Sequence, residues 1–437
     1  MRIILAFLFV CVAFFANAYD FMVEGICYNK NSDGINVEVT YEGNPHPDIW
    51  SYANAPRDIV IPEKVKYNDT TYTVTSIGIH AFFGCRNVCS VRIPNTVTSI
   101  GREAFCNCIC LSKIDIPESV ISIGVRAFHN TDWYNSLPDG LIYAGMVAYA
   151  YKVDRDPMPL NKSIKLKKGC TGIAGGAFSG NPEIISVRIP NTVKTIGDGA
   201  LRGCGLTSIT IPNSVTTIGD DCFSYSKLIS IEIPNSVTTI GEFAFEGCSD
   251  LKSVTIPNSV TSIGRGAFEE CKSLSSIEIP NSVTSIEELA FYDCSSLTSV
   301  VIGNSVTSIG EYAFCECVNL SSVEIPNSVT TIGHGAFQEC KGLISLTIPP
   351  SLVIKDHAFA SCSKLTTIIV SYYGTSKGDN SLINTELTSH PIEKPSLSIY
   401  AFSFNNCREL KVLKVPKGQR DYFKNIHVVP DEAIEEY

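Results

Sequence analysis

The segment IPNSVTSIGRGAFEECKSLSSIE runs from Ile256 to Glu278, and IPNSVTSIEELAFYDCSSLTSVV follows it directly from Ile279 to Val301. A third copy, IPNSVTTIGHGAFQECKGLISLT, begins at Ile325. Self-similarity at a fixed period of roughly 20–50 residues predicts a solenoid, in which each repeat stacks on the next as one rung. The 437-residue chain is therefore expected to form a repeat array rather than several independent globular domains.

One aromatic or leucine position marks each repeat and sets the number of rungs at 13. These landmarks are Phe82, Phe105, Phe128, Phe178, Leu201, Phe223, Phe245, Phe268, Phe291, Phe314, Phe337, Phe359 and Phe402. They follow one another at 22 or 23 residues except for steps of 50 and 43, which indicate insertions near 130–165 and 372–395. Stacked rungs align equivalent side chains, so the aromatic column is expected to form the core.

Each repeat combines short strands with turns. In the stretch from Leu274 to Ile279, alternation directs Ile277 and Ile279 inward and Glu278 outward, as in a strand. Pro280-Asn281-Ser282 then makes a turn, and 283–286 is a second strand-like stretch. The stretch 288–294 is expected to form a helical turn, which predicts an α/β repeat solenoid that is rich in β-structure.

The first 18 residues have the features of a secretory signal peptide. Arg2 precedes an uncharged apolar run from Ile3 to Phe15, and Ala16-Asn17-Ala18 resembles a cleavage site. The run is shorter than the roughly 20 residues that span a bilayer, so a membrane anchor is the weaker alternative. A lipoprotein anchored at Cys11 is a second alternative. The mature chain is predicted to begin at Tyr19, to have no transmembrane segment, and to be exported to the cell surface or the medium.

The repeated pattern IPxSVTxIGxxAFxxCxxL resembles the BspA-like leucine-rich repeats of bacterial surface proteins, in the form found in the Bacteroides group. The stretches VEVTYEGN and KYNDTTYTVTSIG resemble that group's N-terminal cap, and 133–152 resembles one of its insertions. The resemblance implies a right-handed leucine-rich-repeat solenoid used for adhesion or binding. After the signal peptide (1–18), the chain is expected to divide into a β-rich cap (19–72), the solenoid (73–415) and a C-terminal cap or tail (416–437).

Cysteine is unusually frequent, and nine of the 18 stand three residues after the aromatic landmark. They are Cys85, Cys108, Cys204, Cys248, Cys271, Cys294, Cys317, Cys340 and Cys362. Members of such a column have parallel Cβ directions, whereas a disulfide needs them turned toward each other. The column is therefore expected to remain buried thiols. A local disulfide involving Cys89, Cys106 or Cys110 is an open alternative, and a zinc site there is a weaker one.

The sequence contains no recognisable catalytic motif and predicts no cofactor or metal. His80, His334 and His357 stand at variable positions near the Ala-Phe pair, where other repeats carry acids or arginine. A position with such tolerance is typical of a solvated turn rather than of a general base. The net charge of −10 argues against a broad nucleic-acid-binding surface. An enzymatic activity would have to reside in an inserted segment.

The outward strand position varies between repeats and is the predicted partner-binding face. Its charged members are Arg92, Asp115, Arg188, Glu232, Glu278 and Glu324. The alternation of glutamate with uncharged residues also relieves repulsion between stacked carboxylates, so it does not by itself require a ligand. The first insertion is a rival site, where Trp133, Tyr134 and Tyr143 are expected on a projecting hairpin with a turn at Asp139-Gly140. The sequence predicts a non-catalytic protein that binds an extracellular protein or glycan, and a structural spacer without a ligand is the alternative.

Overall fold

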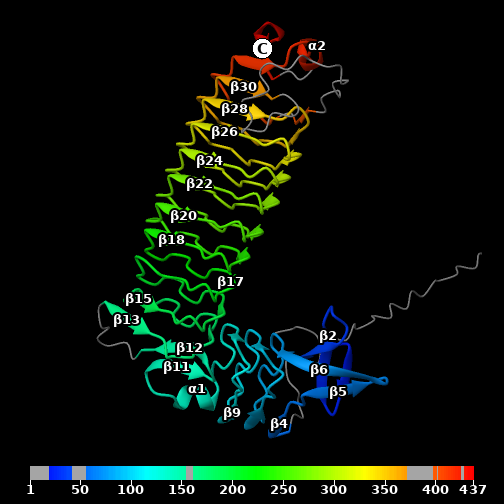
Figure 1. Ribbon diagram of the computed structural model, residues 1–437, viewed down its shortest axis with the longest axis vertical. Helices are drawn as coiled ribbons and strands as arrows, with labels where there is room; N and C mark the ends of the chain where they lie inside the picture. The colour runs from blue at the N-terminus through cyan, green and yellow to red at the C-terminus, as the bar shows by residue number, and fades with distance from the viewer. Residues whose placement is uncertain (1–18, 42–55, 154–160, 372–396, 401, 425–427) are drawn as a thin grey trace, which may run out of the picture. The chain divides into compact units, whose positions relative to one another are not determined.

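The computed structural model describes residues 19–41, 56–153, 161–371, 397–400, 402–424 and 428–437. The chain divides into two compact units, Met1–Pro138 and Asp139–Tyr437, and in both of them strands stack rung upon rung (Figure 1). The expected signal peptide and the expected insertion near 372–395 lie outside the described residues. No described helix is long and apolar enough to cross a membrane.

The first unit joins an antiparallel start to a parallel ladder. Its main sheet has the order β1-β2-β3-β6-β8-β10 with β5 beside β6, and a smaller sheet has the order β4-β7-β9. The strands β1 to β3 pair antiparallel, whereas β6 pairs in parallel with both β3 and β8. The predicted N-terminal cap is therefore continuous with the first rungs. The elements are β1 (Phe21–Val23), β2 (Ile26–Lys30), β3 (Asn36–Thr40), β4 (Asp58–Val60), β5 (Lys64–Tyr67), β6 (Thr70–Ile77), β7 (Ser90–Arg92), β8 (Ser99–Ile100), β9 (Lys113–Asp115), β10 (Ser122–Ile123) and α1 (Asp132–Ser136).

The second unit carries two rows of short strands. The strands of the first row are three to five residues long, and most strands of the second row are two residues long. Apart from the antiparallel hairpin β11-β12, its strand pairs are parallel and join equivalent residues of successive rungs. The first row contains β13 (Lys162–Lys165), β15 (Ile184–Arg188), β18 (Ser230–Glu232), β20 (Ser253–Thr255), β22 (Ser276–Glu278), β24 (Ser299–Val301), β26 (Ser322–Glu324), β28 (Ser345–Ile348), β30 (Thr367–Val370), β32 (Val412–Val415) and β33 (Ile434–Glu436).

The second row lies along the other edge of the stack, where Figure 1 labels β17. It contains β11 (Gly140–Ala144), β12 (Val147–Lys152), β14 (Gly172–Ile173), β16 (Thr195–Ile196), β17 (Thr217–Ile218), β19 (Thr239–Ile240), β21 (Ser262–Ile263), β23 (Ser285–Ile286), β25 (Ser308–Ile309), β27 (Thr331–Ile332), β29 (Val353–Ile354) and β31 (Ser398–Ile399). Two short helices, α2 (Arg420–Phe423) and η3 (Asp431–Ala433), precede β33, which closes the C-terminal end by pairing with β32.

The aromatic column forms the core, as the repeat spacing predicts. From Phe223 to Phe359, neighbouring rings lie 5.1–5.4 Å apart between centroids and within 10° of parallel. The rings of Phe82, Phe105 and Phe128 stack in the same way in the first unit. Every one of these side chains is at most 1% exposed, so they exclude water from each rung.

The last member of the column is Phe404, and the expectation of Phe402 is wrong. The Phe404 ring stacks on Phe359 at 5.2 Å, whereas Phe402 is 56% exposed and lies against His357. Ser403 takes the place of the alanine that precedes the aromatic residue in other repeats, and its carbonyl accepts the Phe359 N–H. The Ala401-Phe402 pair matches the Ala-Phe motif in sequence but stands two residues before the true landmark, and only the ring stacking identifies Phe404 as that landmark.

The predicted helical turn is also absent, because among the described residues no repeat contains a helix. Between Glu287 and Cys294, backbone N–H groups alternate between two kinds of acceptor. Ala290 and Tyr292 donate to carbonyls of their own rung, and Leu289, Phe291 and Asp293 donate to the next rung. Leu289 and Asp293 adopt φ of 60° and 49°. A helix would use every N–H within the rung, so stacking replaces half of the helical bonds.

The glycine of the T-S-I-G motif lies where the backbones of two successive rungs approach closely. A Cβ added at Gly264 would lie 2.6 Å from the backbone nitrogen of Glu242 and 2.7 Å from the carbonyl carbon of Gly241. Gly264 also donates its N–H to Ile240 at 2.9 Å. Other rungs carry Ala174, Glu287 or Lys355 at this position. Ala174 and Lys355 still donate the equivalent bond, at 2.8 Å to Ala148 and 3.0 Å to Ile332, so the backbones of those rungs accommodate a Cβ.

Gly264→Ala is therefore expected to destabilise the protein by about 2 kcal/mol, because the neighbouring backbone must move to admit the Cβ and a hydrogen bond is strained. Urea denaturation followed by circular dichroism measures this cost. Gly199→Ala is the matched control, since Gly199 has φ +58° and a Cβ there would meet nothing within 4 Å. That change should cost only about 1 kcal/mol for the left-handed backbone. Equal costs for the two variants would contradict the close-approach explanation.

Candidate binding face

The outward positions of the longer strands form a column on the surface of the second unit. Ile231 and Ile277 are buried, while the adjacent Glu232 and Glu278 are exposed, so the strands alternate as their sequence predicts. The register aligns Glu232 with Thr255 and Glu278 with Val301 on neighbouring strands. Within the described residues, neither Glu232 nor Glu278 forms an ion pair, so their charges face solvent.

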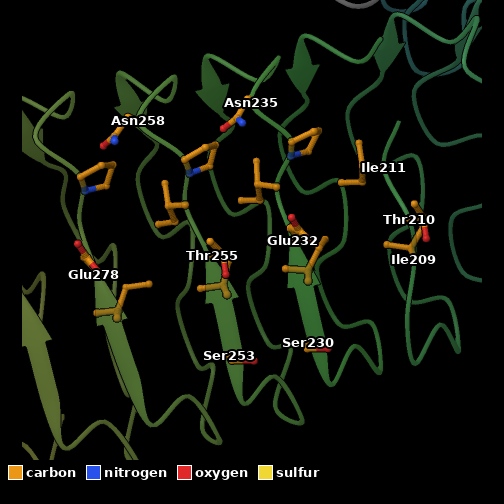
Figure 2. A pocket seen from close by; sticks show the side chains of 18 of the residues that line it. Ile209, Thr210, Ile211, Ser230, Glu232, Asn235, Ser253, Thr255, Asn258 and Glu278 are labelled. Carbon is orange, nitrogen blue, oxygen red and sulfur yellow. The ribbon is translucent and has the colours of Figure 1, made fainter. Parts of the chain in front are cut away.

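This column forms part of an open groove of about 1260 Å³. Figure 2 shows Glu232, Thr255 and Glu278 on successive strands, with Ser230 and Ser253 at the strand starts and Asn235 and Asn258 on the turns. The groove extends from Asn191 to Val301 and is lined by strand hydroxyls on one side and turn amides on the other. Its lining is therefore rich in hydrogen-bonding groups and negatively charged.

A second hollow of about 670 Å³ adjoins the groove and has the opposite charge. It is lined by Lys165, Lys168 and Arg188, and it shares Ser208 and Thr210 with the groove. Lys165 pairs with Arg188 across β13 and β15. Neither lysine was predicted from the sequence, because no Ala-Phe landmark precedes Lys165 at the usual spacing. The match of Ser-Ile-Lys-Leu at 163–166 to Ser-Val-Arg-Ile at 186–189 could have revealed that rung.

The structure brings together only part of the predicted face. Glu232 and Glu278 line the groove, and Arg188 lines the basic hollow beside it. Glu324 occupies the same column on β26, beyond the groove, and pairs with Thr347. Arg92 and Asp115 face each other in register on β7 and β9, in the first unit.

Residues of the first insertion pack against the repeats of the unit to which each belongs. Trp133, on α1, lies edge-on against Phe128 with 5.2 Å between the ring centroids, and Tyr134 beside it is half-buried. The hairpin β11-β12 turns at Gly145-Met146 rather than at Asp139-Gly140, and β12 pairs with β14 to start the ladder of the second unit. The expectation of a projecting hairpin is therefore wrong, because its second strand is needed by the adjacent rung.

Tyr143 is held by contacts within the second unit. Its hydroxyl accepts the Lys167 N–H at 2.8 Å, and the Lys167 Nζ lies 4.2 Å from the centre of its ring. Partial burial raises the pKa of the Tyr143 hydroxyl. These contacts assign Tyr143 to the packing of the hairpin, although its side chain retains some exposure.

The cysteine column has a bonding role that the repeat spacing did not reveal. Eight of its nine predicted members donate to the carbonyl oxygen of the aromatic residue one rung earlier, as Cys294 does to Phe268 at 3.2 Å. Residues that make this contact are Cys108, Cys204, Cys248, Cys271, Cys294, Cys317, Cys340, Cys362 and Cys407. Cys407 joins the column because Phe404 is the last landmark. A thiol is small enough for the turn and satisfies a buried carbonyl.

Other polar residues take the same position where cysteine is missing. Thr131 and Asn181 donate to the carbonyls of Phe128 and Phe178, and the Ser226 hydroxyl contacts the Cys248 thiol. All 17 cysteines of the described residues are free thiols, including Cys89, Cys106 and Cys110, for which a local disulfide was the alternative. Burial raises the pKa of the Cys271, Cys294, Cys317 and Cys340 thiols well above their usual value.

The histidines contact residues of neighbouring turns. His80 pairs with Glu103 at 3.2 Å, and the rings of His334 and His357 meet edge-on at 5.4 Å between centroids. Across the part of the chain that the structure describes, no three histidine, cysteine or acidic side chains are grouped so that they could hold a metal ion.

Comparison with known families identifies the repeat. The pattern described as the BspA type leucine rich repeat region matches in six copies, over residues 62–148, 171–298 and 284–411. A search of curated proteins found no match.

Several solved structures of bacterial leucine-rich repeat proteins are similar to this chain. A protein from Bacteroides ovatus is 27% identical, with 96% of this chain and 100% of that chain covered and a TM-score of 0.42. A leucine rich cell surface protein from Faecalibacterium prausnitzii is 26% identical, with coverage of 81% and 95% and a TM-score of 0.36. The pneumococcal vaccine antigen PcpA is 16% identical, with coverage of 95% and 98% and a TM-score of 0.35.

Proposed function

Because this chain belongs to the BspA-type leucine-rich repeat family, we propose that it acts outside the cell, where it binds another protein and catalyses no reaction. The residues expected to direct its export, 1–18, lie outside the described residues, and their sequence supports this location. The partner is an extracellular protein that docks on the groove of the second unit. A fold hosts many functions, so the proposal depends on the groove rather than on the family alone.

The observation that carries the proposal is the open polar groove along the strand face. Repeat solenoids commonly bind partners on such extended surfaces. The Glu232 and Glu278 carboxylates form no ion pair within the described residues, and exposed serine hydroxyls flank them. Groups of this kind steer a partner of opposite charge and hydrogen-bond to it at little cost in desolvation.

Glu232→Lys/Glu278→Lys is expected to weaken binding of a partner by about tenfold or more at low salt, because two attractive charges become repulsive. A screen of the mature chain, residues 19–437, against extracellular matrix proteins and glycan arrays identifies the partner under reducing conditions. Surface plasmon resonance at several salt concentrations then measures the variant.

Glu242→Lys/Glu311→Lys is the matched control, since both residues are exposed acids on turns outside the groove. It should leave the affinity nearly unchanged. Tyr134→Ala tests the insertion as a rival site. Binding that survives charge reversal but is lost in the tyrosine variant would transfer the site to the insertion. A folded protein without any saturable partner would contradict the proposal and favour the structural spacer.

A further inference from the structure

The basic hollow beside the groove has no role in the proposed function. It measures about 670 Å³ and is lined by Lys165, Lys168 and Arg188, all of them exposed. Lys165 lies on β13 and Arg188 on the neighbouring β15, and Lys168 follows on the turn after β13 (Figure 1). The hollow therefore gathers three positive charges in a chain whose net charge is −10.

Lys165 and Arg188 are direct neighbours across two parallel strands. The register of β13 and β15 places them opposite each other, and such strands lie about 4.8 Å apart. Like charges that face each other on adjacent strands repel and destabilise the sheet. An anion held between these two side chains would remove the repulsion, so this pair gains stability when an anion binds.

The three cations of the hollow form no ion pair within the described residues. Other basic side chains of the second unit do pair with acids on a neighbouring rung, as Arg265 does with Glu288 at 3.0 Å. The charges of the hollow are therefore not neutralised by the fold and remain available to a ligand.

The rest of the lining is polar wherever it is exposed. The other exposed residues among the described lining are Ser186, Asn191, Ser208 and Thr210. The apolar lining residues, such as Val187 and Ile189, are buried or half-buried. Protein partners are usually anchored by aromatic or aliphatic side chains in apolar pockets, and this lining offers no exposed apolar surface for one. It offers hydroxyl and amide groups, which suit a ligand that is rich in hydroxyls.

We propose that the basic hollow binds an acidic glycan, a sugar chain that carries sulfate or carboxylate groups. The oxyanion lies between Arg188 and Lys165, where the guanidinium donates two parallel hydrogen bonds and the ammonium adds a point charge. Lys168 faces it from the turn, and Ser186 and Asn191 hydrogen-bond to sugar hydroxyls. A hollow of this size falls in the range of small-ligand pockets, so it takes a short stretch of the glycan.

Labelled tetrasaccharides test the charge requirement on the full mature chain, residues 19–437. Fluorescence anisotropy compares a heparin-derived probe with sulfate groups, a hyaluronan probe with carboxylates alone, and neutral maltotetraose. At least one acidic probe is expected to bind saturably, about tenfold or more tightly than maltotetraose, and its affinity should fall as salt is added. The preferred acidic probe identifies the oxyanion. Equal affinities for the acidic and the neutral probes would overturn the proposal.

Lys165→Gln/Arg188→Gln is expected to weaken binding of the acidic tetrasaccharide by about tenfold or more, because both cations that flank the oxyanion are lost. Lys227→Gln/Lys252→Gln is the matched control. It removes the same net charge from exposed lysines of the second unit that lie outside the hollow, and it should change the affinity less than about twofold. Circular dichroism verifies that both variants fold. Equal losses in the two variants would show that only net charge matters and would overturn the site.

An acidic peptide is the competing occupant, and labelled tetraglutamate represents it. It should bind at least about threefold more weakly than the preferred tetrasaccharide, because it has no hydroxyls for the polar lining. Equal or tighter binding of tetraglutamate would overturn the glycan assignment. The proposed function is tested separately through Glu232 and Glu278, which do not line the hollow. Absence of saturable binding by both acidic tetrasaccharides would overturn this inference alone and leave the groove standing.

Discussion

Raising the pH from 8 to 10 is expected to remove at least about 10 kcal/mol from the free energy of unfolding of the second unit. Burial raises the pKa of the Cys222, Cys271, Cys294, Cys317 and Cys340 thiols well above their usual value. In the unfolded chain these thiols titrate near pH 8.5. The folded form holds their protons, so the stability they contribute is complete below about pH 8.5 and is lost as the pH rises.

For each buried thiol, every pH unit above 8.5 lowers the free energy of unfolding by about 1.4 kcal/mol, which amounts to about 2 kcal/mol per thiol at pH 10. Native domains are stable by about 5–15 kcal/mol, so the second unit should unfold near pH 10. Urea denaturation in a reducing buffer at several pH values measures this loss.

Cys271→Ser/Cys294→Ser/Cys317→Ser is the variant that isolates the thiols, because a serine hydroxyl does not ionise in this range. Ser226 already occupies the same column position, so the hydroxyl is accommodated. Removing three thiols at about 2 kcal/mol each should make the loss between pH 8 and 10 about 6 kcal/mol smaller than in the natural chain. The same loss in the variant and in the natural chain would rule out the buried thiols as its cause.

Phe268→Ala is expected to reduce the free energy of unfolding by about 3–5 kcal/mol. The ring is fully buried and stacks on Phe245 at 5.2 Å and on Phe291 at 5.4 Å, so truncation leaves a cavity and removes both contacts. The neighbouring rungs are joined by backbone hydrogen bonds and cannot collapse into the space. Urea denaturation of the full chain measures the change.

Phe402→Ala is the control for the aromatic column. Phe402 is 56% exposed, so its truncation should cost less than about 1 kcal/mol. Phe404→Ala should cost more than Phe402→Ala, since the Phe404 ring stacks on Phe359. The reverse order would return Phe402 to the column, and a cost below about 1 kcal/mol for Phe268→Ala would show that the stack is not the core.

The period of the sequence was sufficient to predict the stacking of the repeats, the buried aromatic column and the outward direction of Glu232 and Glu278. A 23-residue period leaves one arrangement in which every apolar position finds an equivalent neighbour. The same alternation also identified the candidate face, because the exposed position of each strand is read directly from its two buried neighbours.

Contacts between rungs determined the features that the period did not predict. The short stretch before Cys294 resembles a helical turn by composition, but its N–H groups bond to the next rung as well as to their own. The thiols became donors to carbonyls because stacking places each one beside the aromatic residue of the previous rung. Phe404 replaced Phe402, and the hairpin β11-β12 became the start of a sheet, for the same reason. Periodicity describes one repeat, whereas distances between successive repeats exist only in the folded chain.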